Sequence, residues 1–252
     1  MKLSAVIIAR DEEAKIGTAI KSVLFADEVL LVDSGSTDKT RDIAVALGAR
    51  VIELPWNGFA KQKQIATDLA ANDWILSIDA DEEISAELAA EIRGRLNDDT
   101  YFSAFRIPRK NIYLGKFIRF SGWYPDWQTR LFDRRKGEWL DRVVHESFKV
   151  SDGNVGSLQN PMIHRSIDSL EDHRHMIRDR YAPLGASEMQ RQGRRTTLLH
   201  AIVAGPATFL GLFVLRLGFL DGFRGLAIAY FSAYHNVLKH LHLRILQKQK
   251  LP

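Results

Sequence analysis

The sequence of 252 residues contains no cysteine, and this absence removes two classes of site. Neither a disulfide nor a thiolate metal site can form, so a cytosolic setting fits. Hydrophobic residues make up 46% of the chain and charged residues 26%. That composition is enough for one sizeable α/β core, with or without a small appendage.

Two phosphate-binding signatures are also missing. The chain contains neither Gly-x-Gly-x-x-Gly nor Gly-Lys-Ser/Thr, which argues against a dinucleotide-dependent dehydrogenase and a P-loop enzyme. Met1 to Ile8 carries one Lys and too short an apolar stretch for a secretory signal. The formal charge of +4 is a modest basic excess. It suits anionic partners such as nucleotides, phosphorylated glycans, a membrane surface or nucleic acid.

What is present in the first third is a strict alternation of strands and helices. Short apolar runs predict strands, and helical spacing separates them, with Gly48 as a stop signal. The expected strands are Leu3 to Ala9, Glu28 to Val32, Ala49 to Leu54 and Asp73 to Ile78. Helices are expected over residues 12–25 and 61–71, and Ser36-Thr37-Asp38 offer caps for a helix that runs through Leu47. Ser85 is expected to cap another that runs through Leu96. The pattern predicts a doubly wound, mostly parallel α/β sheet.

The remainder of the chain has a different character. Residues 101–148 are rich in aromatics and Arg, with strand-like runs at 102–107, 129–132 and 143–148. They predict a mixed-sheet half that holds an acceptor. Residues 168–195 predict a polar, Arg-rich helical stretch. The division expected is therefore a catalytic domain over 1–195 and a C-terminal region over 196–252.

The C-terminal region carries no formal charge from Thr196 to Leu215, and its tail is basic. Its Gly and Pro content and marginal length favour helices that lie on a membrane over a spanning helix. A short transmembrane helix and an ordinary helical layer packed on the catalytic domain remain as alternatives.

Polar loops follow three of the predicted strands. They are Arg10-Asp11-Glu12-Glu13, Asp33 to Asp38, and Asp79-Ala80-Asp81-Glu82. In a doubly wound sheet such loops converge on one crevice. The carboxylates of Asp79 and Asp81, one residue apart, suit a hard divalent cation that also holds phosphate oxygens. Alternatively, each loop is an ordinary strand-to-helix turn.

Taken together, these loops resemble family 2 glycosyltransferases of the GT-A fold, in particular a branch of lipopolysaccharide-core β-glucosyltransferases. Further segments match that branch in order across nearly the whole chain: Trp56 to Gln64, Gly122 to Asp126, Arg130-Leu131-Phe132, Val144-His145-Glu146 and Gly218 to Gly222. One position departs from the pattern, because relatives usually carry Asn where this chain has Asp11. The extra carboxylate either alters the local charge or preserves a turn.

The resemblance implies a UDP-sugar donor and a divalent cation, Mg²⁺ or Mn²⁺. The implied donor-binding residues are Ala9, Arg10, Glu12, Asp33, Ser34, Lys63, Asp79 and Arg130. Asp81 is the first candidate for a metal ligand, with Asp79 and His145 as further candidates. His145 in a strand could instead be structural, and Arg130 could instead form a structural ion pair.

An inverting transfer needs a base that takes the proton of the acceptor hydroxyl. Asp126 is the leading candidate because it lies in Trp123-Tyr124-Pro125-Asp126-Trp127, whose rings can stack on sugar faces. Glu146 is the alternative, and Asp126 could instead be only a turn residue after Pro125.

The function expected is transfer of a hexose, plausibly glucose, to a lipid-linked acceptor such as inner-core heptose of lipopolysaccharide. The expected location is peripheral, on the cytoplasmic face of the bacterial inner membrane, with no nucleic-acid partner. A sugar-nucleotidyltransferase, a transferase for another polyprenyl- or lipid-linked glycan, and a non-enzymatic binding module are the alternatives.

Overall fold

The computed structural model describes residues 1–98, 101–140 and 147–249. The chain forms two compact units. The sheet unit contains Met1–Lys110 and Asp126–His164, and the helical unit contains Asn111–Pro125 and the chain from Arg165 onward. The predicted division at residue 195 was drawn from composition. The two units are interleaved along the chain and do not test that boundary, so it stays a prediction.

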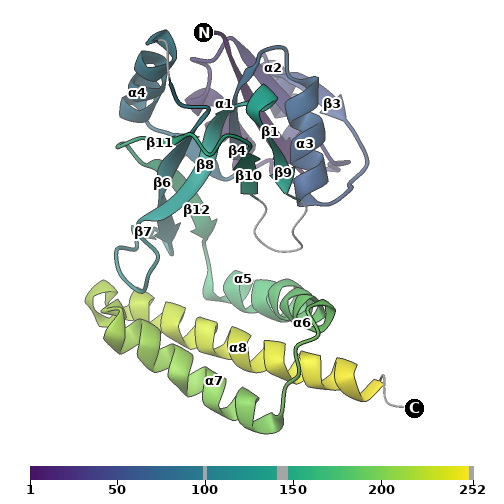
Figure 1. Cartoon of the computed structure of the whole chain (residues 1–252), viewed down its shortest axis with the longest axis vertical. Helices are drawn as coiled ribbons and strands as arrows, with labels where there is room; N and C mark the ends of the chain where they lie inside the picture. The colour runs from purple at the N-terminus through teal and green to yellow at the C-terminus, as the bar shows by residue number, and fades with distance from the viewer. Residues whose placement is uncertain (99–100, 141–146, 250–252) are drawn as a thin grey trace. The chain divides into compact units, whose positions relative to one another are not determined.

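One mixed sheet forms the centre of the sheet unit (Figure 1). Its main path runs β3-β2-β1-β4-β8-β6-β12-β5. The strands are β1 Leu3–Ala9, β2 Glu28–Asp33, β3 Arg50–Glu53, β4 Trp74–Asp79, β5 Glu82–Ile84, β6 Ala104–Tyr113, β8 Asp126–Asp133 and β12 Met162–Ile167. β11 (Val155–Ser157) and β7 (Lys116–Phe117) also pair with β6. β1 to β4 are parallel, whereas β8 runs antiparallel to both β4 and β6.

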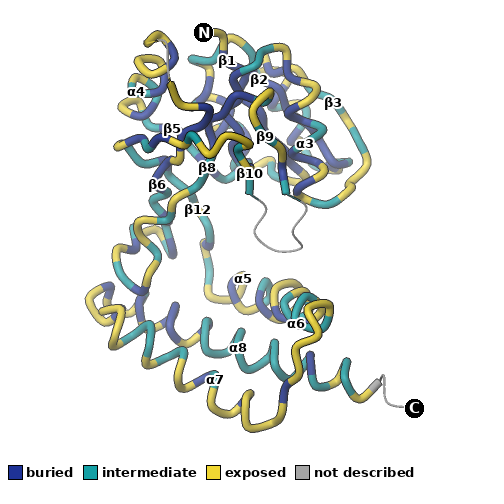
Figure 2. Tube along the Cα trace, in the orientation of Figure 1, coloured by how far each residue is buried: buried dark blue, intermediate teal, exposed yellow. Residues whose placement is uncertain are grey.

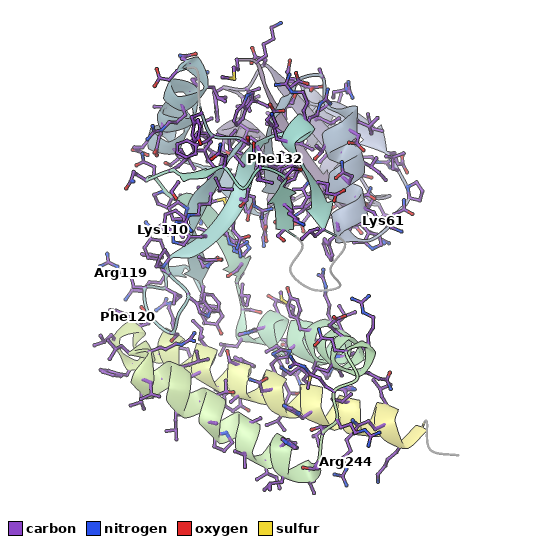
Figure 3. All side chains as sticks on the ribbon, viewed as in Figure 1. Lys61, Lys110, Arg119, Phe120, Phe132 and Arg244 are labelled. Atoms are coloured by element: carbon purple, nitrogen blue, oxygen red, sulfur yellow. The ribbon has the colours of Figure 1, made fainter. Side chains whose placement is uncertain are left out.

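Alternate residues of β1 build two separate cores, as the two-residue period of a strand requires. Ile7 packs with the helices α1 (Ile16–Ser22), α2 (Thr40–Ala46) and α4 (Ala86–Asn97) on one face. Ile8 packs with α3 (Phe59–Leu69) and the small β9–β10 hairpin, Gly137–Leu140 and Ser147–Val150, on the other. Figure 3 labels Phe132, on β8, and Lys61, on α3. The predicted α/β class with a mixed second half is confirmed.

The order of the strands fixes where polar loops can meet. β1 lies between β2 and β4, so the chain turns one way after β1 and the other way after β3. This is the switch point at which open α/β sheets bind ligands, outside the carboxyl ends of the strands. Both Arg10, after β1, and Asp81, after β4, follow the strands that flank this point.

Element boundaries agree with the sequence predictions closely for the strands and less well for the first helix. β1 matches Leu3 to Ala9, and Ser85 caps α4 by accepting a hydrogen bond from the Leu88 amide, at 3.2 Å. The helix expected from Glu12 begins only at Ile16, because Asp11 has a positive φ of 53° and starts a turn. Most of the strand expected over 143–148 lies outside the described residues, and β10 begins at Ser147.

The helical unit is an assembly of packed helices. α5 (Leu170–His175), a π-helical turn (Met176–Tyr181) and α6 (Ala182–Arg191) form one stretch, and α7 (Leu198–Leu210) and α8 (Phe223–Gln249) form a hairpin. In Figure 1, α7 and α8 lie side by side. Their close approach depends on Gly205, because a Cβ there would come within 2.7 Å of Val237. An Asn236–Thr208 hydrogen bond of 2.8 Å also joins them.

The face of α7 away from α8 is exposed and apolar. Figure 2 colours much of this helix as exposed. Together with the π-helical turn Gly211–Leu215 it makes an 18-residue helix, Leu198–Leu215, and only 11% of it is buried. By length and composition alone it could cross a membrane, and it is the single such helix in the described part of the chain.

Candidate functional site

The loop after β2 is organised around the buried carboxylate of Asp33. It accepts hydrogen bonds from the amides of Gly35 and Ser36, at 2.9 and 2.8 Å, and from the Ser36 hydroxyl. The positive φ of Gly35, 83°, allows the tight turn that brings these donors back to one side chain. Asp33 therefore shapes the loop, and its predicted contact with the nucleotide stays a prediction.

Asp11 ties the loop after β1 to the loop after β2. Its carboxylate accepts a hydrogen bond from the Thr37 amide at 2.8 Å, and its own amide donates to the Ser36 hydroxyl at 2.9 Å. The Thr37 amide is also the main reason that the pKa of Asp11 is lowered. Asp and Asn are the residues that best tolerate its left-handed backbone. Of the two alternatives for this position, the structure favours preservation of the turn.

Asp79, at the end of β4, is held between two cations. Its carboxylate lies 2.8 Å from Nζ of Lys63 and 2.5 Å from a terminal nitrogen of Arg130. Burial would raise the pKa of Asp79, but the charges of Arg130 and Lys63 outweigh it and lower that pKa. The Lys63 side chain is only 2% exposed and its ammonium lies 5.2 Å from the centre of the Trp139 ring. Because each carboxylate oxygen already faces a cation, this arrangement leaves Asp79 poorly placed as a metal ligand.

A β-bulge sets the position of Arg130. β6 and β8 pair as Phe105 with Leu131 and then as Arg106 with Thr129, so Arg130 is the extra residue. Bulges re-aim side chains in this way. Nε of Arg130 is buried and has no hydrogen-bond partner among the described residues.

Glu82 is a site residue to which the sequence analysis assigned no role. It is fully buried on β5. Its carboxylate accepts from Arg130 at 2.6 Å, from Arg109 at 3.0 Å and from the Asp79 amide at 2.9 Å. The position directly after Asp79-Ala80-Asp81 was a visible signal, but its partners are distant in sequence and appear only on folding.

The same network reaches the candidate base. Arg109 donates to Asp126 from Nε at 2.8 Å, and its terminal nitrogen lies 2.7 Å from the same carboxylate. The side-chain amide of Gln128 donates from Nε2 to the other carboxylate oxygen of Asp126 at 2.6 Å. Alternating charges thus connect Lys63 to Asp126 in the order Lys63, Asp79, Arg130, Glu82, Arg109, Asp126.

Asp81 lies apart from this network and beside a histidine. Nε2 of His164, on β12, is 3.3 Å from its carboxylate. Burial, and then the charge of Asp81, raise the pKa of Glu12. Among the described residues no three His, Asp or Glu side chains form a metal-binding group. His164 was missed in the sequence because it lies some 80 residues beyond Asp81 in a polar strand.

The other predicted site residues are placed as follows. Ala9 is buried at the end of β1, and its carbonyl accepts from the Ser34 amide at 2.9 Å. The Ser34 hydroxyl is buried without a hydrogen-bond partner in the described part of the chain. Arg10 is exposed, with its nearest carboxylate at Asp11, 3.6 Å away. His145 and Glu146 lie outside the described residues.

Comparison with known proteins gives consistent results. The family model of glycosyl transferase family 2 matches residues 4–149. An uncharacterized glycosyltransferase of Rickettsia bellii is 32% identical over all of this chain and 89% of its own length. The lipopolysaccharide core biosynthesis glycosyltransferase LpsC of Rhizobium meliloti is 28% identical over 95% of this chain and 93% of its own.

A solved structure shares the fold. It is the glucosyl-3-phosphoglycerate synthase of Mycobacterium tuberculosis, crystallised with Mn²⁺, UDP and glucosyl-3-phosphoglycerate. The TM-score is 0.50 at 20% identity, and the match covers 78% of this chain and 81% of that one. From the family match and the full-length relatives, the chain belongs to glycosyl transferase family 2 and is a glycosyltransferase of GT-A fold.

Proposed function

We propose that this glycosyltransferase is an inverting enzyme that transfers a hexose from a UDP-sugar to a lipid-linked acceptor, with glucose as the first candidate sugar. Inner-core heptose of lipopolysaccharide is the acceptor suggested by the similarity to LpsC. The observation that carries the proposal is the pair of basic side chains, Lys63 and Arg130, held by Asp79 at the end of β4.

The donor side follows from charge. Lys63 and Arg130 are buried cations beside the carboxyl end of β4, and a diphosphate bound next to that end would lie in their positive field. Negative charge develops on the leaving nucleoside diphosphate as the glycosidic bond breaks. Cations fixed in place beforehand stabilise that charge without reorganising. In this proposal Asp79 orients the two cations, and Asp33, Arg10, Glu12 and the Ala9–Ser34 backbone surround the nucleotide.

Asp81 and His164 fit a divalent cation, Mg²⁺ or Mn²⁺. They offer one carboxylate and one imidazole, with Nε2 of His164 3.3 Å from the carboxylate. Two protein ligands are enough when the substrate's phosphate oxygens complete the shell, as is usual for Mg²⁺. A bound cation would act as a Lewis acid on the leaving diphosphate. It would also offset the charge of Asp81, which after burial is the next cause that raises the pKa of Glu12. His164 is our candidate imidazole ligand among the described residues, and the role of His145 stays a prediction.

Asp126 is the proposed base. Arg109 and Gln128 hold both oxygens of its carboxylate, which keeps the side chain in one orientation. An ionised, oriented carboxylate can take the proton of the acceptor hydroxyl as the hydroxyl attacks the sugar.

Membrane attachment is the second part of the proposal. As a spanning helix, the 18 residues Leu198–Leu215 would be about 27 Å long at 1.5 Å per residue, slightly short of a hydrocarbon core of about 30 Å. Its packed partner α8 carries Lys239 and Arg244, which oppose insertion of the hairpin. We therefore place the hairpin on the surface, at the cytoplasmic face of the inner membrane, where UDP-sugars are found.

Heat unfolding with UDP and Mn²⁺ tests the donor site. A ligand that binds only the folded state raises its stability. We expect UDP with Mn²⁺ to raise the melting temperature of the wild type and of the exposed control Asp42→Ala. In Asp81→Ala the part of this increase that depends on Mn²⁺ should be lost. No shift for the wild type at millimolar ligand, or an unchanged Mn²⁺ effect in Asp81→Ala, contradicts the assignment.

A further inference from the structure

The segment Gly218 to Gly222 matches the family branch, yet nothing in the chemistry described above uses it. It includes a one-turn helix (Gly218–Asp221) between the π-helical turn and α8. Asp221 is buried, and its carboxylate accepts hydrogen bonds from the amides of Phe120 and Arg119, at 2.9 and 3.3 Å. Figure 3 labels Arg119 and Phe120, which lie on the loop 114–125 beside this end of the helical hairpin. Asp221 thus attaches that loop to the hairpin.

Three further hydrogen bonds attach the same loop. Arg224 donates to the Leu114 carbonyl from two nitrogens, at 2.9 and 3.1 Å, and the Ser121 amide donates to the Arg216 carbonyl at 2.9 Å. The backbones pack closely, since a Cβ on Gly218 would lie 2.4 Å from the Ser121 hydroxyl oxygen. Residues 216–224 therefore hold the loop at Leu114 and at residues 119–121. It ends at Pro125, the residue directly before Asp126.

The outer surface of this attachment is apolar. The exposed large hydrophobic residues of the turn are Val214, Leu215, Leu217, Phe219, Leu220 and Phe223, which we call the apolar turn. Phe219 is 48% exposed and Phe223 62%. In water such a cluster is unfavourable, and clusters of this kind mark surfaces that bind a membrane or another protein.

The charge around the apolar turn selects a membrane of anionic lipid. Positions 111–125 and 211–225, which form the loop and the turn, contain two Lys and Arg residues each, four in all: Lys116, Arg119, Arg216 and Arg224. Their only acidic residue is Asp221, which is buried and bonded to two backbone amides. An apolar cluster flanked by basic residues, with no exposed acidic residue in these two segments, suits the interface of an anionic bilayer, where each basic residue near the surface adds about 1 kcal/mol of attraction.

We propose that the apolar turn docks on a bilayer containing anionic phospholipid. Asp221 is then the positioning residue, because its hydrogen bonds keep the loop 114–125 beside the turn and therefore at the bilayer. The inference rests on the proposed lipid-linked acceptor, because the loop that Asp221 holds would then lie at the bilayer that carries this acceptor. The loop also bears aromatic side chains suited to sugar faces: Phe117 and Tyr124 contact each other edge to face, with ring centres 5.1 Å apart.

Vesicle binding tests the docking surface without donor or acceptor. Phe219→Asp and Phe223→Asp change exposed side chains, so both variants should fold, and Val45→Asp on α2 is an equally exposed control. We expect each Phe variant to bind phosphatidylcholine–phosphatidylglycerol vesicles at least about tenfold more weakly than wild type, and the control to bind normally. Equal binding of all four proteins, equal binding to pure phosphatidylcholine, or self-association through this turn overturns the docking surface.

A label on the loop tests the role of Asp221. Because the chain has no cysteine, Tyr124→Cys gives a single site for a nitroxide. We expect vesicles to shield this nitroxide from a water-soluble relaxation reagent. With Asp221→Asn added, vesicle binding and protection by UDP with Mn²⁺ should persist while the shielding falls by at least half. Asp221→Glu serves as a second variant. Unchanged shielding in both variants overturns the positioning role, and neither arm depends on transfer activity.

Discussion

Removal of the charge at Glu82 is the perturbation that tests the buried network most sharply. Glu82→Gln keeps the size of the side chain but leaves the cations of Lys63, Arg109 and Arg130 facing only Asp79 and Asp126. Removing one partner of a buried ion pair destabilises a protein by about 3–5 kcal/mol. Both arginines retain a second carboxylate, so we expect the lower end, about 3 kcal/mol.

For a protein of this size about 3 kcal/mol corresponds to a fall in melting temperature of about 6–12 °C. The assay is urea unfolding, followed by thermal unfolding, of wild type, Glu82→Gln and the exposed control Glu138→Gln. The control should change the free energy of unfolding by no more than about 0.5 kcal/mol. If Glu82→Gln costs less than about 1 kcal/mol, or no more than its control, the reasoning that places Glu82 at the centre of the network is refuted.

Three further predictions concern the base, the hairpin and a buried histidine. Asp126→Asn should lower kcat by about 10²–10⁴ while the KM for the donor changes little, and steady-state kinetics with a nearly neutral Asp126→Asn would reject it as the base. Gly225→Ala should destabilise the protein by more than about 2 kcal/mol, because its Cβ would lie 1.7 Å from the Gly218 carbonyl oxygen. Gly94→Ala on α4, where no atom lies within 4 Å of an added Cβ, should instead stabilise it by about 0.5–1 kcal/mol. Equal free energies of unfolding for the two variants would contradict this. Burial, with a smaller contribution from His235, lowers the pKa of His173 to about 4, so between pH 6.5 and 4 the unfolded chain binds a proton that the folded chain does not. The stability contribution of about 3 kcal/mol that is present above pH 6.5 is therefore lost as the pH falls through that window. Parallel curves of unfolding free energy against pH for wild type and His173→Gln would exclude this effect.

The sheet was predictable because its signals are local. Ile7 and Ile8 lie in one continuous apolar run, and a run of that kind flanked by helical spacing predicts a buried parallel strand whatever the rest of the chain does. Ser85 capped its helix as expected for the same reason. The start of α1 was missed because it depends on contacts between Asp11 and Thr37 on another loop.

The site was only partly predictable, since its chemistry depends on long-range partners. Asp79 and Asp81 share one motif, yet the structure gives them different surroundings: Asp79 faces two cations and Asp81 a histidine. Nothing near Glu82 or His164 in sequence signals their partners. The bulge that singles out Arg130 arises from the pairing of β6 with β8, which no local pattern specifies.

The central claim is inverting transfer from a nucleoside-diphosphate sugar. The most direct measurement incubates the purified full chain with a panel of UDP-sugars, Mn²⁺ and truncated lipopolysaccharide core acceptors, and determines the new linkage by NMR. The account predicts a hexose, glucose first, joined through a β-linkage from the α-linked donor. An α-linked product, or transfer only from donors that lack a diphosphate, would contradict it.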